Sequence, residues 1–165
     1  MDLSKLHVRA LLCACLAVSA ATGAGEDPVA WSASLTPSSH KPVARGAHFT
    51  VELQAIIQPG WHLYALDQPD RGPIATDISL APGQPFSFAG TISAPKPHSL
   101  FDANFNMAVG FYIEKVQFRV PVGVEKTASA GATTLNIRAR YQCCNDKMCL
   151  PPKTTTVAVP VEIQP

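Results

Sequence analysis

The segment KVQFRVPVGV, residues 115–124, places an apolar side chain at every second position. Successive side chains of a β-strand point to opposite faces of the sheet, so this pattern predicts a strand with one buried face. Three further segments show the same period: residues 48–57 (HFTVELQAII), 133–141 (TTLNIRARY) and 155–163 (TTVAVPVEI). Four half-buried strands of this kind indicate antiparallel sheets that cover one core.

Proline and glycine interrupt the sequence often, with 15 prolines and 10 glycines. They disfavour long helices and separate short strands. We therefore predict an all-β fold for residues 25–165, a single domain built as an immunoglobulin-like antiparallel β-sandwich. Residues 25–41 are expected to form a loose entry segment that ends in a first strand. Residues 67–101 are expected to be mostly loop, where binding residues often sit.

Residues 1–24 (MDLSKLHVRALLCACLAVSAATGA) have the layout of a secretory signal peptide. Lys5 and Arg9 precede an apolar run, and small residues follow it. The run is shorter than the roughly 20 apolar residues that cross a bilayer. The segment predicts export, to the periplasm or an equivalent compartment, with cleavage after Ala20 or Ala24. A lipid-anchored form or an unusual membrane anchor is the alternative.

The composition of the remaining chain narrows the partners that it could bind. The net charge is +1 and only 15% of the residues are charged. No basic cluster stands out, so nucleic acid is not expected as a partner. No second apolar run occurs, so no transmembrane segment is expected in the mature chain.

A cleaved leader would leave three cysteines, all within YQCCNDKMCLPP, residues 141–152. Asn and Asp in the segment 145–148 tolerate the backbone conformations of a tight reversal. Cys144 and Cys149 are therefore expected to flank the tip of a hairpin. Facing residues of antiparallel strands come within disulfide distance there.

The alternation of the preceding strand assigns the two adjacent cysteines to opposite faces. Cys143 is expected to point into the core as a small buried hydrophobe. Cys144 is expected to point outward, beside Arg138 and Arg140, and to form the disulfide with Cys149.

The size of the ring that a Cys144–Cys149 disulfide would close indicates whether the bond is mainly structural. Closing a six-residue ring stabilises a fold by about 2 kcal/mol, against roughly 4–5 kcal/mol for a ring of about 100 residues. A short exposed ring is also easier to reduce. Two alternatives remain open: a structural hairpin disulfide in a non-catalytic, partner-binding sandwich, and a zinc or copper site that includes His62. Because no C-x-x-C occurs and the histidines are scattered, no metal site is predicted.

The same stretch is similar to a motif of a known family: Tyr-Gln-x-Cys, a short polar loop, then Cys-x-Pro-Pro. The matching residues are Tyr141, Gln142, Cys144, Cys149, Pro151 and Pro152. Residues 59–64 (PGWHLY) and 102–112 (DANFNMAVGFY) are similar to two further segments of that family. Over roughly residues 43–163 the chain resembles the N-terminal periplasmic domain of the thiol:disulfide interchange protein DsbD.

This resemblance implies an immunoglobulin-like sandwich whose redox-active pair is Cys144 and Cys149. No cofactor is expected, because the electrons reside in the two cysteines. Phe105 is expected to lie on a cap loop that shields the pair from stray oxidants. Tyr64 and Tyr141 are expected to line the site.

The implied activity is that of a protein-disulfide reductase. The module would receive reducing equivalents from a membrane-embedded thiol reductase and pass them to thioredoxin-like periplasmic proteins, in disulfide correction and cytochrome c maturation. In this reading Cys144 attacks first, its thiolate stabilised by the flanking arginines, and Cys149 resolves the mixed disulfide.

Two departures from the family pattern stand out. Ala103 and Asn104 replace acidic neighbours of the cap phenylalanine, which leaves in doubt any tuning of the thiols by those positions. The chain also lacks the membrane domain and the C-terminal thioredoxin-like domain of the full-length protein. It is therefore expected to be either a stand-alone module that works with a separate membrane reductase or a relative with altered partners.

Overall fold

The computed structural model describes residues 27–36, 42–103 and 105–165. The expected signal peptide, residues 1–24, and Asn104 lie outside the described residues. Within them every regular element is a β-strand. Among these residues no helix has the length and apolar character needed to cross a bilayer. The strands are β1 (Val29–Thr36), β2 (His48–Ile57), β3 (His62–Tyr64), β4 (Asp77–Leu80), β5 (Phe86–Phe88), β6 (His98–Asp102), β7 (Met107–Tyr112), β8 (Lys115–Val124), β9 (Gly131–Tyr141), β10 (Cys143–Cys144) and β11 (Lys153–Ile163).

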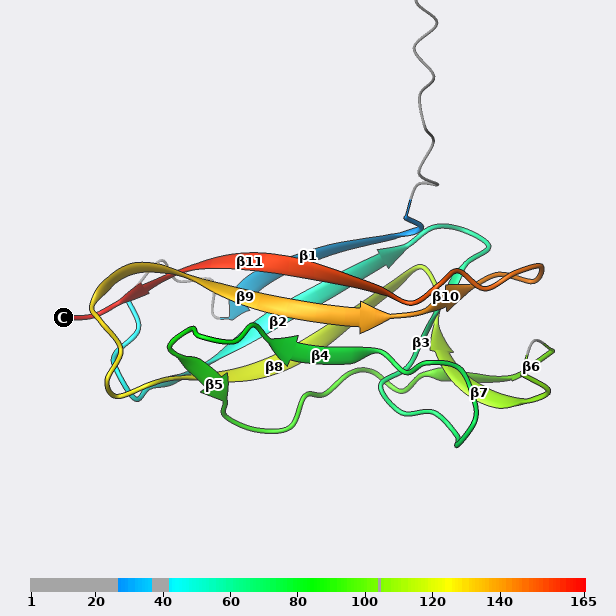
Figure 1. The fold of residues 1–165 in the computed structure, drawn as a ribbon, viewed down its shortest axis with the longest axis horizontal. Coiled ribbons are helices and arrows are strands. Elements are labelled where there is room, and N and C mark those ends of the chain that lie inside the picture. The colour runs from blue at the N-terminus through cyan, green and yellow to red at the C-terminus, as the bar shows by residue number, and fades with distance from the viewer. Residues whose placement is uncertain (1–26, 37–41, 104) are drawn as a thin grey trace, which may run out of the picture.

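The strands form three antiparallel sheets. Two of them, in the orders β1-β2-β8-β5 and β11-β9-β4, make the immunoglobulin-like sandwich. The third, in the order β10-β3-β7-β6, lies at one end of the molecule, opposite the end that carries the C-terminus (Figure 1). The all-β class and the sandwich architecture predicted from the sequence are confirmed.

The apolar faces predicted from the sequence form the core between the two main sheets. β2 and β8 have the predicted bounds, and β9 and β11 each begin two residues earlier than predicted. Leu53 of β2 faces Phe118 of β8, and Leu135 of β9 faces Val159 of β11. Trp31 of β1 stacks on Phe118 with 5.9 Å between the ring centroids. Period-two alternation thus predicted which side chains are buried.

Two segments contain more regular structure than expected. The entry segment, residues 25–41, contains β1, which pairs along its whole length with β2. Residues 67–101, expected to be mostly loop, contain β4, β5 and most of β6. Each of these three strands is only three to five residues long and extends the edge of a sheet, next to β9, β8 or β7. Strands of that length are too short to show a clear alternation.

The alternation of residues 133–141 was expected to continue through Cys143 and Cys144, but the strand is interrupted at Gln142. β9 ends at Tyr141, opposite Lys153, because Pro151 and Pro152 have no N–H groups to continue the ladder. The Gln142 side chain then links neighbouring segments: its Oε1 accepts a hydrogen bond from the Ile74 amide at 3.1 Å, and its Nε2 donates to the Leu150 carbonyl at 3.3 Å. The next two residues, β10, pair with β3 instead.

Replacing Phe118 by alanine tests the contribution of this core. The side chain is fully buried and contacts the rings of Trp31 and Tyr112. We expect Phe118→Ala to lower the free energy of unfolding by about 3–5 kcal/mol, because it leaves a cavity. Phe88→Ala is the control, since that ring is 43% exposed, and it should cost less than about 1 kcal/mol. Equal losses in denaturant unfolding would contradict this description of the core.

Candidate functional site

The hairpin that carries the cysteines is held by its own backbone. The amide of Asn145 donates to the carbonyl of Met148 at 2.9 Å, and the amide of Leu150 donates to the carbonyl of Cys143 at 3.0 Å. The Asn145 side-chain oxygen accepts hydrogen bonds from the amides of Lys147 and Met148, both at 2.9 Å. The polar loop predicted from Asn and Asp is therefore a closed turn, and Cys144 faces Cys149 across it.

A disulfide joins Cys144 and Cys149, with Cα atoms 4.0 Å apart. This is the pairing expected from the sequence. Cys143 is a free thiol, buried against the main core as expected. Its burial, together with the charge of Asp27, raises the pKa of the Cys143 thiol to about 11.

The predicted exposure of Cys144 is wrong. Its side chain is fully buried. Cys143 and Cys144 do point to opposite faces, but both faces are covered at this end of the molecule. Arg138 and Arg140 stay exposed on β9, which ends before the cysteines.

The side chains that cover Cys144 form a second, smaller hydrophobic group, called here the end cluster. It is separate from the main core. Its members are Tyr64, Val109, Cys144, Phe105, Met107, Phe111 and Cys149. The Phe105 ring meets the Tyr64 ring edge-on, with 5.9 Å between centroids. Phe105 reaches this position from the turn between β6 and β7, where Asn106 adopts a positive φ of 54°.

One buried polar chain runs beneath the disulfide. The Tyr64 hydroxyl donates a hydrogen bond to Oδ2 of Asp102 at 2.6 Å. The same hydroxyl oxygen lies 3.1 Å from Sγ of Cys144 and 3.9 Å from Sγ of Cys149. Burial, and then the hydrogen bond to Asp102, raise the pKa of the Tyr64 phenol well above its ordinary value.

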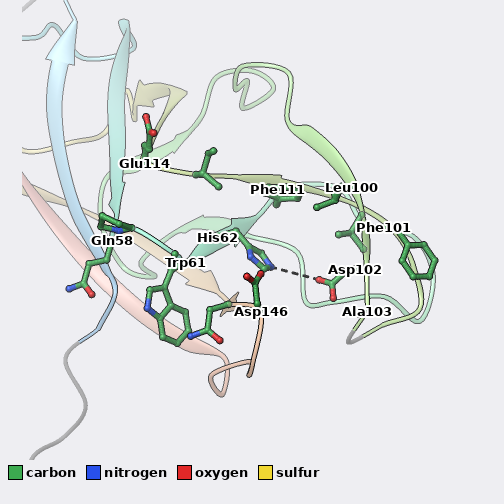
Figure 2. Close-up of a pocket in the computed structure, with 15 residues that line it drawn as sticks. Gln58, Trp61, His62, Leu100, Phe101, Asp102, Ala103, Phe111, Glu114 and Asp146 are labelled. Carbon is green, nitrogen blue, oxygen red and sulfur yellow. Dashed lines mark ion pairs between the residues drawn. The ribbon is translucent and has the colours of Figure 1, made fainter.

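His62 lies at the outer end of this row of polar side chains, next to Asp102. Its Nε2 is 3.7 Å from Oδ2 of Asp102, and the two side chains are 18% and 6% exposed (Figure 2). Burial lowers the pKa of His62, and the nearby charges of Asp102 and Asp146 offset part of that effect. Burial thus favours the neutral imidazole.

Tyr141 does not line this site. Its ring packs in the main core, 5.3 Å from that of Trp31 between centroids. Its hydroxyl donates a hydrogen bond to Asp27, which also forms an ion pair with Lys153 at 2.7 Å. Tyr141 and Cys143 are two residues apart, so their side chains point to the same face, toward the core of the sandwich. The expectation that Tyr141 lies beside the disulfide is corrected accordingly.

A pocket of about 540 Å³ adjoins the hairpin (Figure 2). Its walls come from the β2–β3 turn, β6, β7, the residues that follow β7, and the hairpin tip. His62 and Asp102 lie on its wall, beside Asp146. Leu100 and Phe101, which also line it, are more than 60% exposed. Across the described part of the chain, no group of three or more His, Cys, Asp or Glu side chains is placed to hold a metal ion.

Asp102 is the site residue that the sequence analysis missed. It lies 38 positions from Tyr64 in the chain, and an aspartate next to a loop gives no signal of burial. The sequence analysis raised His62 as a metal ligand but not as a neighbour of the cysteine pair. The only available sign was the similarity of residues 102–112 to a family segment, which drew attention to Phe105 instead.

Comparisons with known proteins identify the family. The family model described as "Thiol:disulfide interchange protein DsbD, N-terminal" matches residues 33–160. No curated protein sequence matches the chain significantly.

Two solved structures are similar to this fold. The N-terminal periplasmic domain of ScsB from Proteus mirabilis is 18% identical, with a TM-score of 0.52 over 82% of this chain. This chain spans only 47% of that one. The Neisseria meningitidis DsbD N-terminal domain in the reduced form is also 18% identical, with a TM-score of 0.49 over 72% of this chain and 82% of that one. Because the family model covers most of the sequence, the chain belongs to the family of DsbD N-terminal domains.

Proposed function

We propose that this chain is an exported thiol–disulfide exchange module whose Cys144–Cys149 bond is broken and re-formed during its work. The observation that carries this proposal is the position of the two sulfurs in the end cluster, apart from the sandwich core and against the Tyr64 hydroxyl. A six-residue ring adds only about 2 kcal/mol to stability, so it is a weak staple. Membership of the DsbD family supports an exchange role.

The proposed path runs from a membrane-embedded thiol reductase, through this pair, to thioredoxin-like proteins. The chain would then act as a protein-disulfide reductase in disulfide correction and cytochrome c maturation. The family and the predicted signal peptide support this assignment. The two thiols carry both electrons, so the exchange needs no cofactor.

We propose that Cys149 attacks first, the reverse of the order expected from the sequence. Cys144 is fully buried, whereas Cys149 is partly exposed. The Cys149 thiolate attacks the partner's disulfide and displaces one partner thiolate, which forms a mixed disulfide. Cys144 then attacks Cys149, re-forms the internal bond and releases the second partner thiolate. The partner gains two electrons and, with two protons, becomes a dithiol.

Trapping with single-cysteine variants tests this order. In Cys144→Ser, Cys149 should form a stable mixed disulfide with an oxidised thioredoxin-like protein, because no thiol remains to resolve it. Cys149→Ser should trap little, since Cys144 is buried. Cys143→Ala should retain exchange, because that thiol faces the main core. Non-reducing gels and mass spectrometry identify the adducts, and loss of exchange in Cys143→Ala would overturn the assignment of the pair.

The reduction potential separates an exchange pair from a structural disulfide. Equilibration with glutathione buffers should give a potential above about −300 mV for the Cys144–Cys149 bond. A potential well below that value would indicate a structural bond and a non-catalytic, partner-binding sandwich.

We also propose that Phe105 shields the pair and must move when a partner docks. Phe105→Ala should speed oxidation of the reduced pair by a small disulfide such as cystamine several-fold, because the ring that covers Tyr64 is removed. Unfolding free energy should fall by only about 1 kcal/mol, since the ring is partly exposed. Phe101→Ala is the matched control, as that ring is 61% exposed and lies outside the end cluster. Equal oxidation rates in wild type and Phe105→Ala would remove the shielding role.

A further inference from the structure

The Tyr64 hydroxyl stands between a carboxylate and the buried sulfur of the pair. A phenol has one proton, and the Asp102 oxygen at 2.6 Å is a far better acceptor than a disulfide sulfur. The hydroxyl is within donor distance of both Asp102 and Sγ of Cys144, at 2.6 and 3.1 Å, but its single proton can serve only one of them at a time and favours Asp102. Once the disulfide is reduced, the Cys144 thiol can donate its hydrogen to the Tyr64 oxygen.

We propose that Tyr64 and Asp102 take up the proton that Cys144 loses when it resolves the mixed disulfide. This inference rests on the proposed exchange function and on Cys149 as the attacking thiol. Tyr64 touches the reacting sulfur and is a catalytic residue. Asp102 acts through Tyr64 and is a positioning residue.

The need for such a relay follows from burial. Cys144 is fully buried among apolar side chains, where an isolated thiolate is costly and where solvent cannot take its proton. Loss of the proton must therefore accompany the attack. A hydrogen-bonded chain that ends in a carboxylate provides an acceptor without leaving a charge on the sulfur.

The step balances as follows. The proton of the Cys144 thiol moves to the Tyr64 oxygen while the Tyr64 proton moves to Oδ2 of Asp102. The Cys144 sulfur bonds to the Cys149 sulfur, and the bond between Cys149 and the partner breaks. The partner sulfur leaves with that electron pair and takes a proton from solvent. Asp102, on the wall of the pocket, then releases its proton toward solvent beside His62.

The titratable groups near Tyr64 and Asp102 are compatible with this transfer of the proton from Cys144 to Asp102. Tyr64 stays a neutral phenol because burial and Asp102 raise its pKa, so it passes a proton without storing charge. His62 faces Asp102 from β3, and burial lowers the pKa of its imidazole. Asp146 acts on His62 from the hairpin tip, and the Cys143 thiol acts on Tyr64 from the opposite face of β10.

Oxidation by dithiobis-nitrobenzoate separates the two steps in one experiment. Attack by Cys149 releases the first thionitrobenzoate, and closure by Cys144 releases the second. The reduced protein, purified from the cell envelope in a Cys143→Ala background, is mixed with the reagent over a range of pH. Asp102→Asn keeps a hydrogen-bond acceptor for Tyr64 but has no carboxylate to take the proton.

We expect Asp102→Asn to slow the second release about a hundredfold at neutral pH and to leave the first release unchanged. Its second release should rise about tenfold per pH unit, because only thiolate formed by hydroxide can react, whereas the wild-type rate should stay nearly flat around neutrality. Tyr64→Phe should behave in the same way. It removes a single oxygen and carries the test if Asp102→Asn does not fold.

The chain contains a matched control, a second tyrosine hydroxyl that donates to an aspartate. Asp27→Asn makes the same change beside Tyr141, in the main core, and should leave both releases unchanged. If folded Asp102→Asn and Tyr64→Phe release the second thionitrobenzoate at the wild-type rate, the proposed proton transfer through Tyr64 to Asp102 is wrong. Failure of the wild-type protein to give a second release at all would instead overturn the proposed exchange function.

Discussion

The pairing of β10 with β3 is the constraint on which the site depends. Only two residue pairs form it, Cys143 with Leu63 and Cys144 with His62. The pairing places Tyr64, the next residue of β3, with its hydroxyl against the Cys144 sulfur, and β7 continues the sheet on the other side. The end cluster and the polar chain both follow from this short ladder, because each member lies on β3, β6, β7, the turn before β7 or the hairpin.

The alternation of apolar residues was sufficient to predict the sandwich and its core, because burial on one face is a local property of a strand. The same parity placed Cys143 and Cys144 on opposite faces, and this was correct. It could not predict that Cys144 is buried, since the side chains that cover the outer face come from the β6–β7 region, far away in the sequence. Tyr141 is the opposite case, in which the alternation was the better guide. Its place in the family motif suggested a site residue, but its parity places it in the core.

Two tyrosine–aspartate pairs flank β10, and they serve different purposes. On the core side, the Tyr141 hydroxyl and Lys153 share Asp27, which ties the start of the first strand to β9 and β11. On the other side, Asp102 receives the Tyr64 hydroxyl that contacts the disulfide. The residue types are identical, so sequence alone could not distinguish them. What distinguishes them is the group on the far side of each phenol: Thr155 for one and a cysteine sulfur for the other.

In the proposed exchange, the unequal burial of the two sulfurs would give each a different part. A sulfur that a partner must attack or release has to reach the surface, and Cys149 meets this condition at the hairpin. A sulfur that only closes the ring gains from burial, because oxidants and competing thiols cannot reach it. Burial also removes the solvent that would accept its proton, so the same packing that protects Cys144 requires an acceptor inside the protein. A buried carboxylate reached through a phenol, Asp102 behind Tyr64, meets that requirement beside the Cys144 sulfur.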